Sequence, residues 1–250
     1  YDPVDLAVDI YQTIITDGLM TKKDYANEAN MTLKEIENRI AAIELTHDFL
    51  EFINASPDAY YIIKDAKLYN PLFELAKKFA TTFPNQGPKY EQTKETAFAL
   101  LGKMVHTGGD TVREVRDYLK NIVSSADNDD YNDAIEDFVE DFRDKLESQP
   151  IQSAADYRKR LEEATPELRQ ISEVYNKTVN RQNRGKNVDS FIADVRETLN
   201  TLNDIKRGDG LTGNLQFSNF SKDQVAEIRE MLVKINLLSG DLIEVYEDEL

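Results

Sequence analysis

The chain contains no cysteine and no tryptophan among its 250 residues, and it has only two histidines, His47 and His106. The absence of cysteine excludes disulfides, thiolate nucleophiles and cysteine-based zinc or iron–sulfur sites. The chain also lacks a G-x-S-x-G serine turn and a G-x-x-x-x-G-K-[ST] phosphate loop, which are common signatures of hydrolases and nucleotide-binding enzymes. We therefore expect a protein that is not an enzyme and that has no cofactor. A mechanism based on carboxylates alone stays open, because no pair can be selected among 47 acidic residues.

Basic residues are scarce relative to acidic ones. The chain has 30 Lys and Arg against 47 Asp and Glu, a formal net charge of -17. A surface of this charge repels phosphate backbones, so we expect no nucleic-acid partner. No apolar run approaches about 18 residues, so we also expect no transmembrane segment. The chain begins with Tyr1 and not with Met. We therefore expect a processed or trimmed precursor, and an extracytoplasmic or secreted location is slightly favoured.

Apolar residues recur at steps of three and four along nearly the whole chain, which is the spacing of amphipathic helices. The clearest series has steps of 3, 4, 3, 4 and 3: Leu33, Ile36, Ile40, Ile43, His47 and Leu50. This heptad-like spacing favours a long helix that lies along another helix. The pattern predicts an all-α fold, an elongated multi-helix bundle with long heptad-like helices. We expect a single domain over 1–250, with a possible sub-boundary at 148–153 and a small irregular segment near 207–220.

Capping residues indicate where several of these helices begin. Thr32 and Glu35 have the spacing of a capping box at the start of the heptad-like series. The dipeptides Ser56-Pro57 and Asn70-Pro71 each place a capping residue before a proline, so they predict two shorter helices that start there. Aromatic residues are concentrated between 60 and 90. Core packing is the first interpretation, and a small-ligand or lipid groove between helices is the alternative.

Glu44 and His47 form a Glu-x-x-His pair. On a helix this spacing places both side chains on one face, as in di-iron bundles, which use two such motifs and two further Glu residues. The second copy is missing, because Lys103 stands three residues before His106. The pair is therefore the only candidate for a metal site, and the alternative is a hydrogen-bonded histidine in an apolar seam.

Charged clusters offer possible contacts with a partner. Lys177, Arg181, Arg184 and Lys186 form the one basic cluster without acidic neighbours. The polar residues 180–187 predict an exposed turn there, and contact with an acidic face of another copy is the alternative. That acidic face lies in 127–147, where Glu136, Glu140 and Asp144 recur every four residues. A solvated helix face is the usual origin of such a pattern, and docking of a basic partner is the alternative.

Arg207, Gly208 and Asp209 form an integrin-type tripeptide in the segment with the weakest helical pattern. If the tripeptide lies exposed at a loop tip, it supports a secreted adhesin or receptor-binding protein. A glycine at this point also suits the end of a helix, because glycine adopts the left-handed conformation without steric cost.

The first 14 residues, from Tyr1 to Ile14, resemble the mature start of the minor pilus components of conjugation and type IV secretion systems. This resemblance implies a secreted helical protein in an envelope context. It includes no functional motif, and the Gln-rich coiled segments of that family are absent, so it assigns no family.

We expect a non-catalytic structural or protein-interaction subunit that acts through helical faces, in an envelope, secretion or virion assembly. Its partner is another protein or a second copy. The first alternative is a ligand- or metal-binding helical bundle, and the second is a secreted adhesin.

Overall fold

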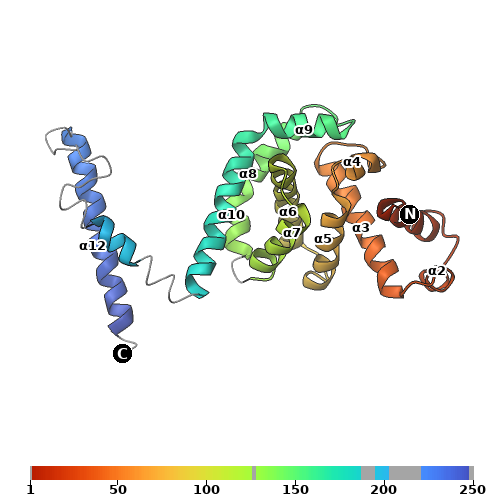
Figure 1. Ribbon diagram of the computed structural model, residues 1–250, viewed down its shortest axis with the longest axis horizontal. Coiled ribbons are helices and arrows are strands. Elements are labelled where there is room, and N and C mark those ends of the chain that lie inside the picture. The colour runs from red at the N-terminus through yellow and green to blue at the C-terminus, as the bar shows by residue number, and fades with distance from the viewer. Residues whose placement is uncertain (1, 126–127, 187–194, 203–220, 248–250) are drawn as a thin grey trace. The chain divides into compact units, whose positions relative to one another are not determined.

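A computed structural model describes residues 2–125, 128–186, 195–202 and 221–247. All regular elements in these ranges are helical, and one isolated bridge between Ala55 and Ile151 is the only β-type pairing among them. The predicted all-α multi-helix bundle is therefore confirmed (Figure 1). The chain divides into two compact units, residues 1–186 and 187–250. Within the described ranges, no helix is both long and apolar enough to cross a membrane.

Within its described residues, the first unit consists of ten helices of very different length and two short π-helical segments. In chain order they are α1 (Pro3–Tyr11), η1 (Gln12–Thr16), α2 (Lys22–Glu28), α3 (Leu33–Phe52), α4 (Tyr60–Asp65), α5 (Tyr69–Thr82), α6 (Pro88–Thr107), α7 (Thr111–Tyr118), η2 (Leu119–Val123), α8 (Asn128–Glu147), α9 (Ala154–Glu163) and α10 (Thr165–Lys186). The suggested sub-boundary at 148–153 falls inside this unit, between α8 and α9.

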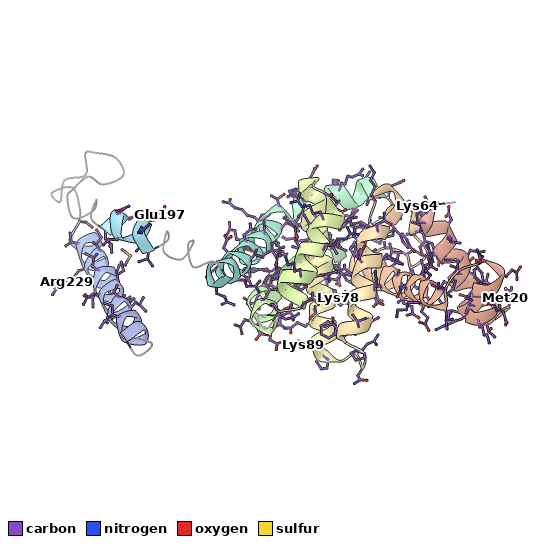
Figure 2. All side chains as sticks on the ribbon, turned by 60° about the horizontal axis from the view of Figure 1, so that its bottom comes forward. Met20, Lys64, Lys78, Lys89, Glu197 and Arg229 are labelled. Carbon is purple, nitrogen blue, oxygen red and sulfur yellow. The ribbon has the colours of Figure 1, made fainter. Side chains whose placement is uncertain are left out.

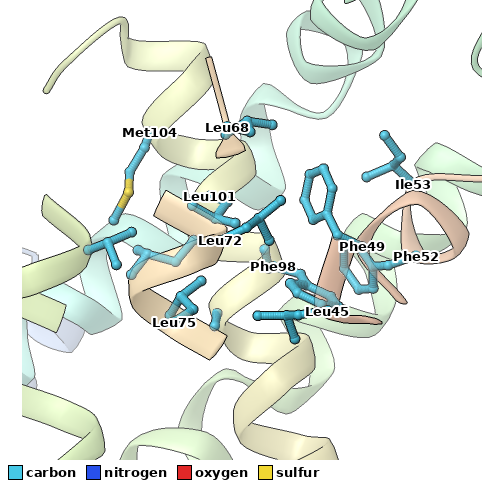
Figure 3. Packing of buried hydrophobic residues seen from close by; sticks show 14 of the residues in the cluster. Leu45, Phe49, Phe52, Ile53, Leu68, Leu72, Leu75, Phe98, Leu101 and Met104 are labelled. Carbon is cyan, nitrogen blue, oxygen red and sulfur yellow. The ribbon is translucent and has the colours of Figure 1, made fainter. Parts of the chain in front are cut away.

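Helix α3 occupies the centre of one half of the core. The predicted seam is buried at Ile36, Ile40, Ile43 and Leu50, while Leu33 at its start is exposed. Further faces of α3 are also buried, because α1 and α2 pack on it as well as α5 and α6. Figure 3 shows Leu45, Phe49 and Phe52 of α3 beside Leu72 and Leu75 of α5 and Phe98 and Leu101 of α6. The helix is thus surrounded by several neighbours and does not pair with one partner along a single seam.

Helices α6, α8 and α10 form the other half of the core. They pack on one another in pairs, and each presents large apolar side chains to the other two. On α8, the buried side chains include Tyr131, Ile135, Phe142 and Leu146. The rings of Phe52 and Phe142 lie 6.2 Å apart between centroids, so the core continues from α3 into α8 without a break.

Some predicted boundaries are right and others are wrong. The capping box at Thr32 and Glu35 begins α3 as expected. Ser56-Pro57 does not start a helix, because the chain forms a turn there and α4 begins at Tyr60, and Asn70-Pro71 lies inside the first turn of α5. The turn predicted at 180–187 is wrong for its described part, because α10 continues to Lys186. Arg, Gln and Lys are good helix formers, so a polar composition alone does not end a helix.

The second unit contains the long helix α12 (Lys222–Glu247) and a helical segment at 195–202. Figure 2 marks this segment by Glu197 and α12 by Arg229, and side chains project from α12 along its length. The irregular segment predicted near 207–220 lies outside the described residues.

Candidate functional site

Glu44 and His47 lie on consecutive turns of α3, but the two side chains have different surroundings. The Nε2 atom of His47 lies 2.5 Å from the hydroxyl oxygen of Tyr60. The ring of Tyr11 meets the His47 imidazole edge-on, with 5.2 Å between centroids. Among the residues that the structure describes, no group of three or more His, Cys, Asp or Glu could hold a metal ion. The geometry therefore agrees with a hydrogen-bonded, half-buried histidine.

Burial shifts the titration of both groups. Desolvation lowers the pKa of His47, and the nearby carboxylates of Asp58 and Asp48 act in the opposite direction. Desolvation also raises the pKa of Glu44, opposed by the positive charge of Lys22 and assisted by the negative charge of Asp48. Each side chain thus favours its neutral form more than it does in water.

A groove of about 430 Å³ lies beside Glu44, between α3 and α5. Both helices contribute residues at steps of three and four, which is why the groove follows their line of contact. Gln86 and Tyr90 close one end. The full lining is Ala41, Glu44, Leu45, Asp48, Ala76, Phe79, Ala80, Phe83, Gln86 and Tyr90.

The two carboxylates of this groove differ in their partners. Asp48 Oδ2 accepts a hydrogen bond of 2.8 Å from the Lys94 ammonium, which also pairs with Glu91 at 2.7 Å. The same Lys94 nitrogen lies 5.3 Å from the centroid of the Tyr90 ring. Glu44 is exposed and feels the positive charge of Lys22, but it has no direct hydrogen-bond or ion-pair partner among the described residues.

The predicted basic cluster lies on the last turns of α10. Lys177 and Arg181 are exposed, and the Arg181 guanidinium lies 3.7 Å from Asp130 at the start of α8. Arg184 and Lys186 also belong to α10. Arg181 of the basic cluster therefore already lies near an acidic residue of α8 in its own chain. On the acidic face of α8, Glu136, Glu140 and Asp144 are exposed. Arg207, Gly208 and Asp209 lie outside the described residues.

Helix α12 exposes an unusual amount of apolar surface. Leu237 and Leu238 are 60% and 62% exposed, and every residue from 231 to 240 is exposed. The large apolar residues that are exposed on α12 are Val225, Met231, Leu232, Val233, Ile235, Leu237, Leu238 and Ile243. Scattered apolar residues on a surface are ordinary, but a contiguous patch on one helix is typical of an interaction site.

The sequence analysis did not predict two features of the structure, the extent of the apolar surface of α12 and the groove between α3 and α5. The stripe Val225, Ile228, Leu232 and Ile235 indicates an amphipathic helix, yet the wider apolar surface that includes Leu237 and Leu238 was not recognised. The groove depends on Ala41, Ala76 and Ala80, whose small size carries no signal until α3 and α5 are placed side by side.

Comparisons of the chain with protein-family models, curated proteins and solved structures found no match.

Proposed function

We propose that this protein is a non-catalytic structural subunit that associates with a second copy of itself through α12. The observation that carries the proposal is the exposed apolar surface of that helix. Burying it removes apolar area from water, which is the main driving force of association.

The apolar area on one side of α12 is a substantial part of what specific association uses. About half of each of eight large side chains is exposed on α12, and at about 100° per residue all of them except Val233 and Leu237 lie on one side of the helix. A specific interface buries about 800 Å² per partner, so surface beyond these side chains must contribute to it. Val195 and Leu199 of the 195–202 helix, both more than half exposed, add to the available area.

The apolar surface is wider than the seam of a two-stranded coiled coil. At about 100° per residue, Val225, Met231, Leu232, Ile235 and Leu238 fall within an arc of about 140°. A two-stranded coiled coil needs only the narrower a and d positions, whereas helices of a bundle bury a broader face. Two copies together supply two α12 helices and two 195–202 helices, which matches the composition of a four-helix bundle.

Charge favours an antiparallel arrangement of the two α12 helices. Residues 222–236 contain three acidic and three basic residues, whereas residues 237–250 contain five acidic residues and no basic one. A parallel pair aligns the two acidic ends and places like charges side by side. An antiparallel pair places each acidic end beside the neutral half of its partner, which avoids this repulsion.

The absence of cysteine makes the arrangement directly measurable. Single cysteines are introduced in the full chain at Ile235 near the centre of α12, at Val225 near its start and at Ile243 near its end. Each variant is treated with a short bismaleimide and analysed on denaturing gels. Leu19→Cys serves as the control, because Leu19 is 74% exposed in the first unit.

Antiparallel association predicts that Ile235→Cys crosslinks alone and that Val225→Cys crosslinks only when mixed with Ile243→Cys. The two Val225 positions then lie about 27 Å apart, at 1.5 Å per residue over 18 residues. Crosslinking of Val225→Cys alone overturns the antiparallel arrangement. A monomeric mass by light scattering at about 100 µM, with no crosslink from any α12 cysteine, overturns self-association itself.

A further inference from the structure

The groove between α3 and α5 has the features of a small-molecule site, independently of α12. We propose that it binds a small organic ammonium ion, with the charged nitrogen at Glu44 and the apolar body against Phe83 and Tyr90. The lining supplies room, an apolar wall and one carboxylate without a direct partner, and each of these restricts the ligand.

Small side chains create the room. Ala41 of α3 and Ala76 and Ala80 of α5 line the groove where larger residues would close it. The resulting volume of about 430 Å³ lies within the range of roughly 300–1,000 Å³ that small-molecule sites occupy. The groove therefore has room for an aromatic or short aliphatic body.

Aromatic rings form the wall at one end of the groove. The centroids of Phe79, Phe83 and Tyr90 lie 5.8–5.9 Å from one another, and the rings meet at steep angles. These contacts hold the rings in place before a ligand arrives. The faces of such rings attract cations, and the protein's own Lys94 ammonium already lies over Tyr90. The wall thus suits a cation that carries an apolar group.

The charges of the groove select the sign of the ligand. Lys94 pairs with both Asp48 and Glu91, so a single ammonium is shared between two carboxylates. Glu44 is exposed and has no hydrogen bond or ion pair with any described residue, and partial desolvation raises its pKa against the effect of the Lys22 charge. An ammonium ion supplies both a charge and N–H donors to this carboxylate, whereas an anionic ligand meets repulsion. A neutral ligand supplies no charge to the carboxylate.

The surroundings of Glu44 also predict how binding depends on pH. Burial and Asp48 raise the pKa of Glu44, while Lys22 of α2 lowers it. The charge of Glu44 in turn contributes to raising the pKa values of Tyr11 on α1 and Tyr90 on α6. Both tyrosines stay neutral below pH 9 because their pKa values are raised above 10.0. Affinity for the cation therefore falls as the pH is lowered through the raised pKa of Glu44.

The test compares 2-phenylethylammonium with 2-phenylethanol, which has a similar shape and no charge, by ligand-observed NMR on the full chain. We expect the ammonium ion to bind at least fivefold more tightly than the alcohol, and Glu44→Gln to remove about that factor. Ala80→Leu fills the groove from an exposed position, so it is expected to abolish binding without disturbing the core. Glu37→Gln is the matched control, because it removes one charge on α3 two turns away and leaves affinity unchanged.

Three results overturn the proposal. One is equal affinity for the ammonium ion and the alcohol. Another is unchanged affinity in Glu44→Gln or in Ala80→Leu while circular dichroism shows an intact fold. The third is the absence of any saturation transfer from the protein to 2-phenylethylammonium at about 10 mM.

Discussion

Phe142 of α8 packs directly onto Gly102 of α6, so closely that a β-carbon at position 102 would lie 2.8 Å from the ring Cζ and 3.3 Å from Leu161 Cδ2. Ala is normally better than Gly inside a helix by about 1 kcal/mol. Here the extra methyl group meets a buried ring, and overpacking costs about 1–3 kcal/mol. The two effects partly cancel, so we expect Gly102→Ala to lower the free energy of unfolding by up to about 2 kcal/mol, measured by urea denaturation of the full chain.

Gly240 of α12 is the matched control, because no atom lies within 4 Å of a β-carbon built there. Only helix propensity then acts, so Gly240→Ala is expected to stabilise α12 by up to about 1 kcal/mol. Thermal melting followed by circular dichroism measures this change. A Gly102→Ala protein that is more stable than the parent by about 1 kcal/mol, as helix propensity alone predicts, would show that the Phe142 ring yields at no cost, contrary to the tight packing of Phe142 on Gly102.

A buried polar network links α6 to α8. The Thr93 hydroxyl donates to the carbonyl of Lys89 over 2.7 Å and accepts a hydrogen bond of 2.9 Å from Asn132 Nδ2. Asn132 is fully buried, so the loss of an acceptor leaves its amide less well satisfied. We expect Thr93→Val, which keeps the shape of the side chain, to cost about 1–3 kcal/mol in urea denaturation.

Thr107 provides the control for this network. Its hydroxyl also donates to the carbonyl four residues earlier, that of Lys103, but the residue is exposed. Thr107→Val is expected to change stability by less than about 0.5 kcal/mol. Equal effects of the two substitutions would mean that the contact with Asn132 contributes nothing.

Features that depend on neighbouring residues could be predicted from the sequence. In the capping box of α3, the amide of Glu35 donates to Thr32 Oγ1 over 3.2 Å, and the amide of Thr32 donates to Glu35 Oε2 over 2.8 Å. Both bonds join residues three apart, so tertiary contacts are not needed. The dipeptide Ser56-Pro57 is equally local, but there the chain turns beside the bridge between Ala55 and Ile151. A tertiary contact therefore accompanies the later start of the helix at Tyr60.

Features that depend on the packing of distant segments could not be predicted. Glu44 was singled out for its spacing from His47, yet its surroundings are set by α5 and by Tyr90, which no spacing on α3 reveals. The hydrogen bond between His47 and Tyr60 likewise joins two elements that the sequence places apart. The apolar residues of α12 can be recognised in the sequence, but whether other elements of the chain cover them depends on the fold.

The stability of the first unit is expected to depend on pH through His47. Its pKa in the folded protein is lowered from 6.5, chiefly by burial. The unfolded chain therefore binds a proton that the folded chain does not, so stability falls as the pH drops through about 6.5 and stops falling below the lowered pKa. Glu44 acts in the opposite direction, because its raised pKa favours proton uptake by the folded state.

A comparison with His47→Gln isolates the histidine. We expect the parent protein to lose more stability than this variant between about pH 7.5 and pH 5, in urea denaturation at a series of pH values. If the free energies of unfolding of the two proteins change with pH in parallel, the pKa of His47 is not lowered in the folded protein. This comparison does not depend on how much stability the variant loses with the hydrogen bond to Tyr60, because only the change with pH is compared.

Salt is expected to strengthen the proposed association of α12. Each copy carries a net charge of -17, so two copies repel each other at low ionic strength, while the contact itself is made by apolar side chains such as Leu232 and Leu238. Screening weakens the repulsion and leaves the hydrophobic contribution in place. Sedimentation equilibrium at about 0.02 M and 0.5 M NaCl should therefore give tighter dimers at the higher salt concentration.

Leu238→Glu should remove the dimer at both concentrations, because it introduces a charge into the apolar arc. If the parent dimer instead dissociates as salt is added, ion pairs and not the apolar face of α12 hold the two copies together.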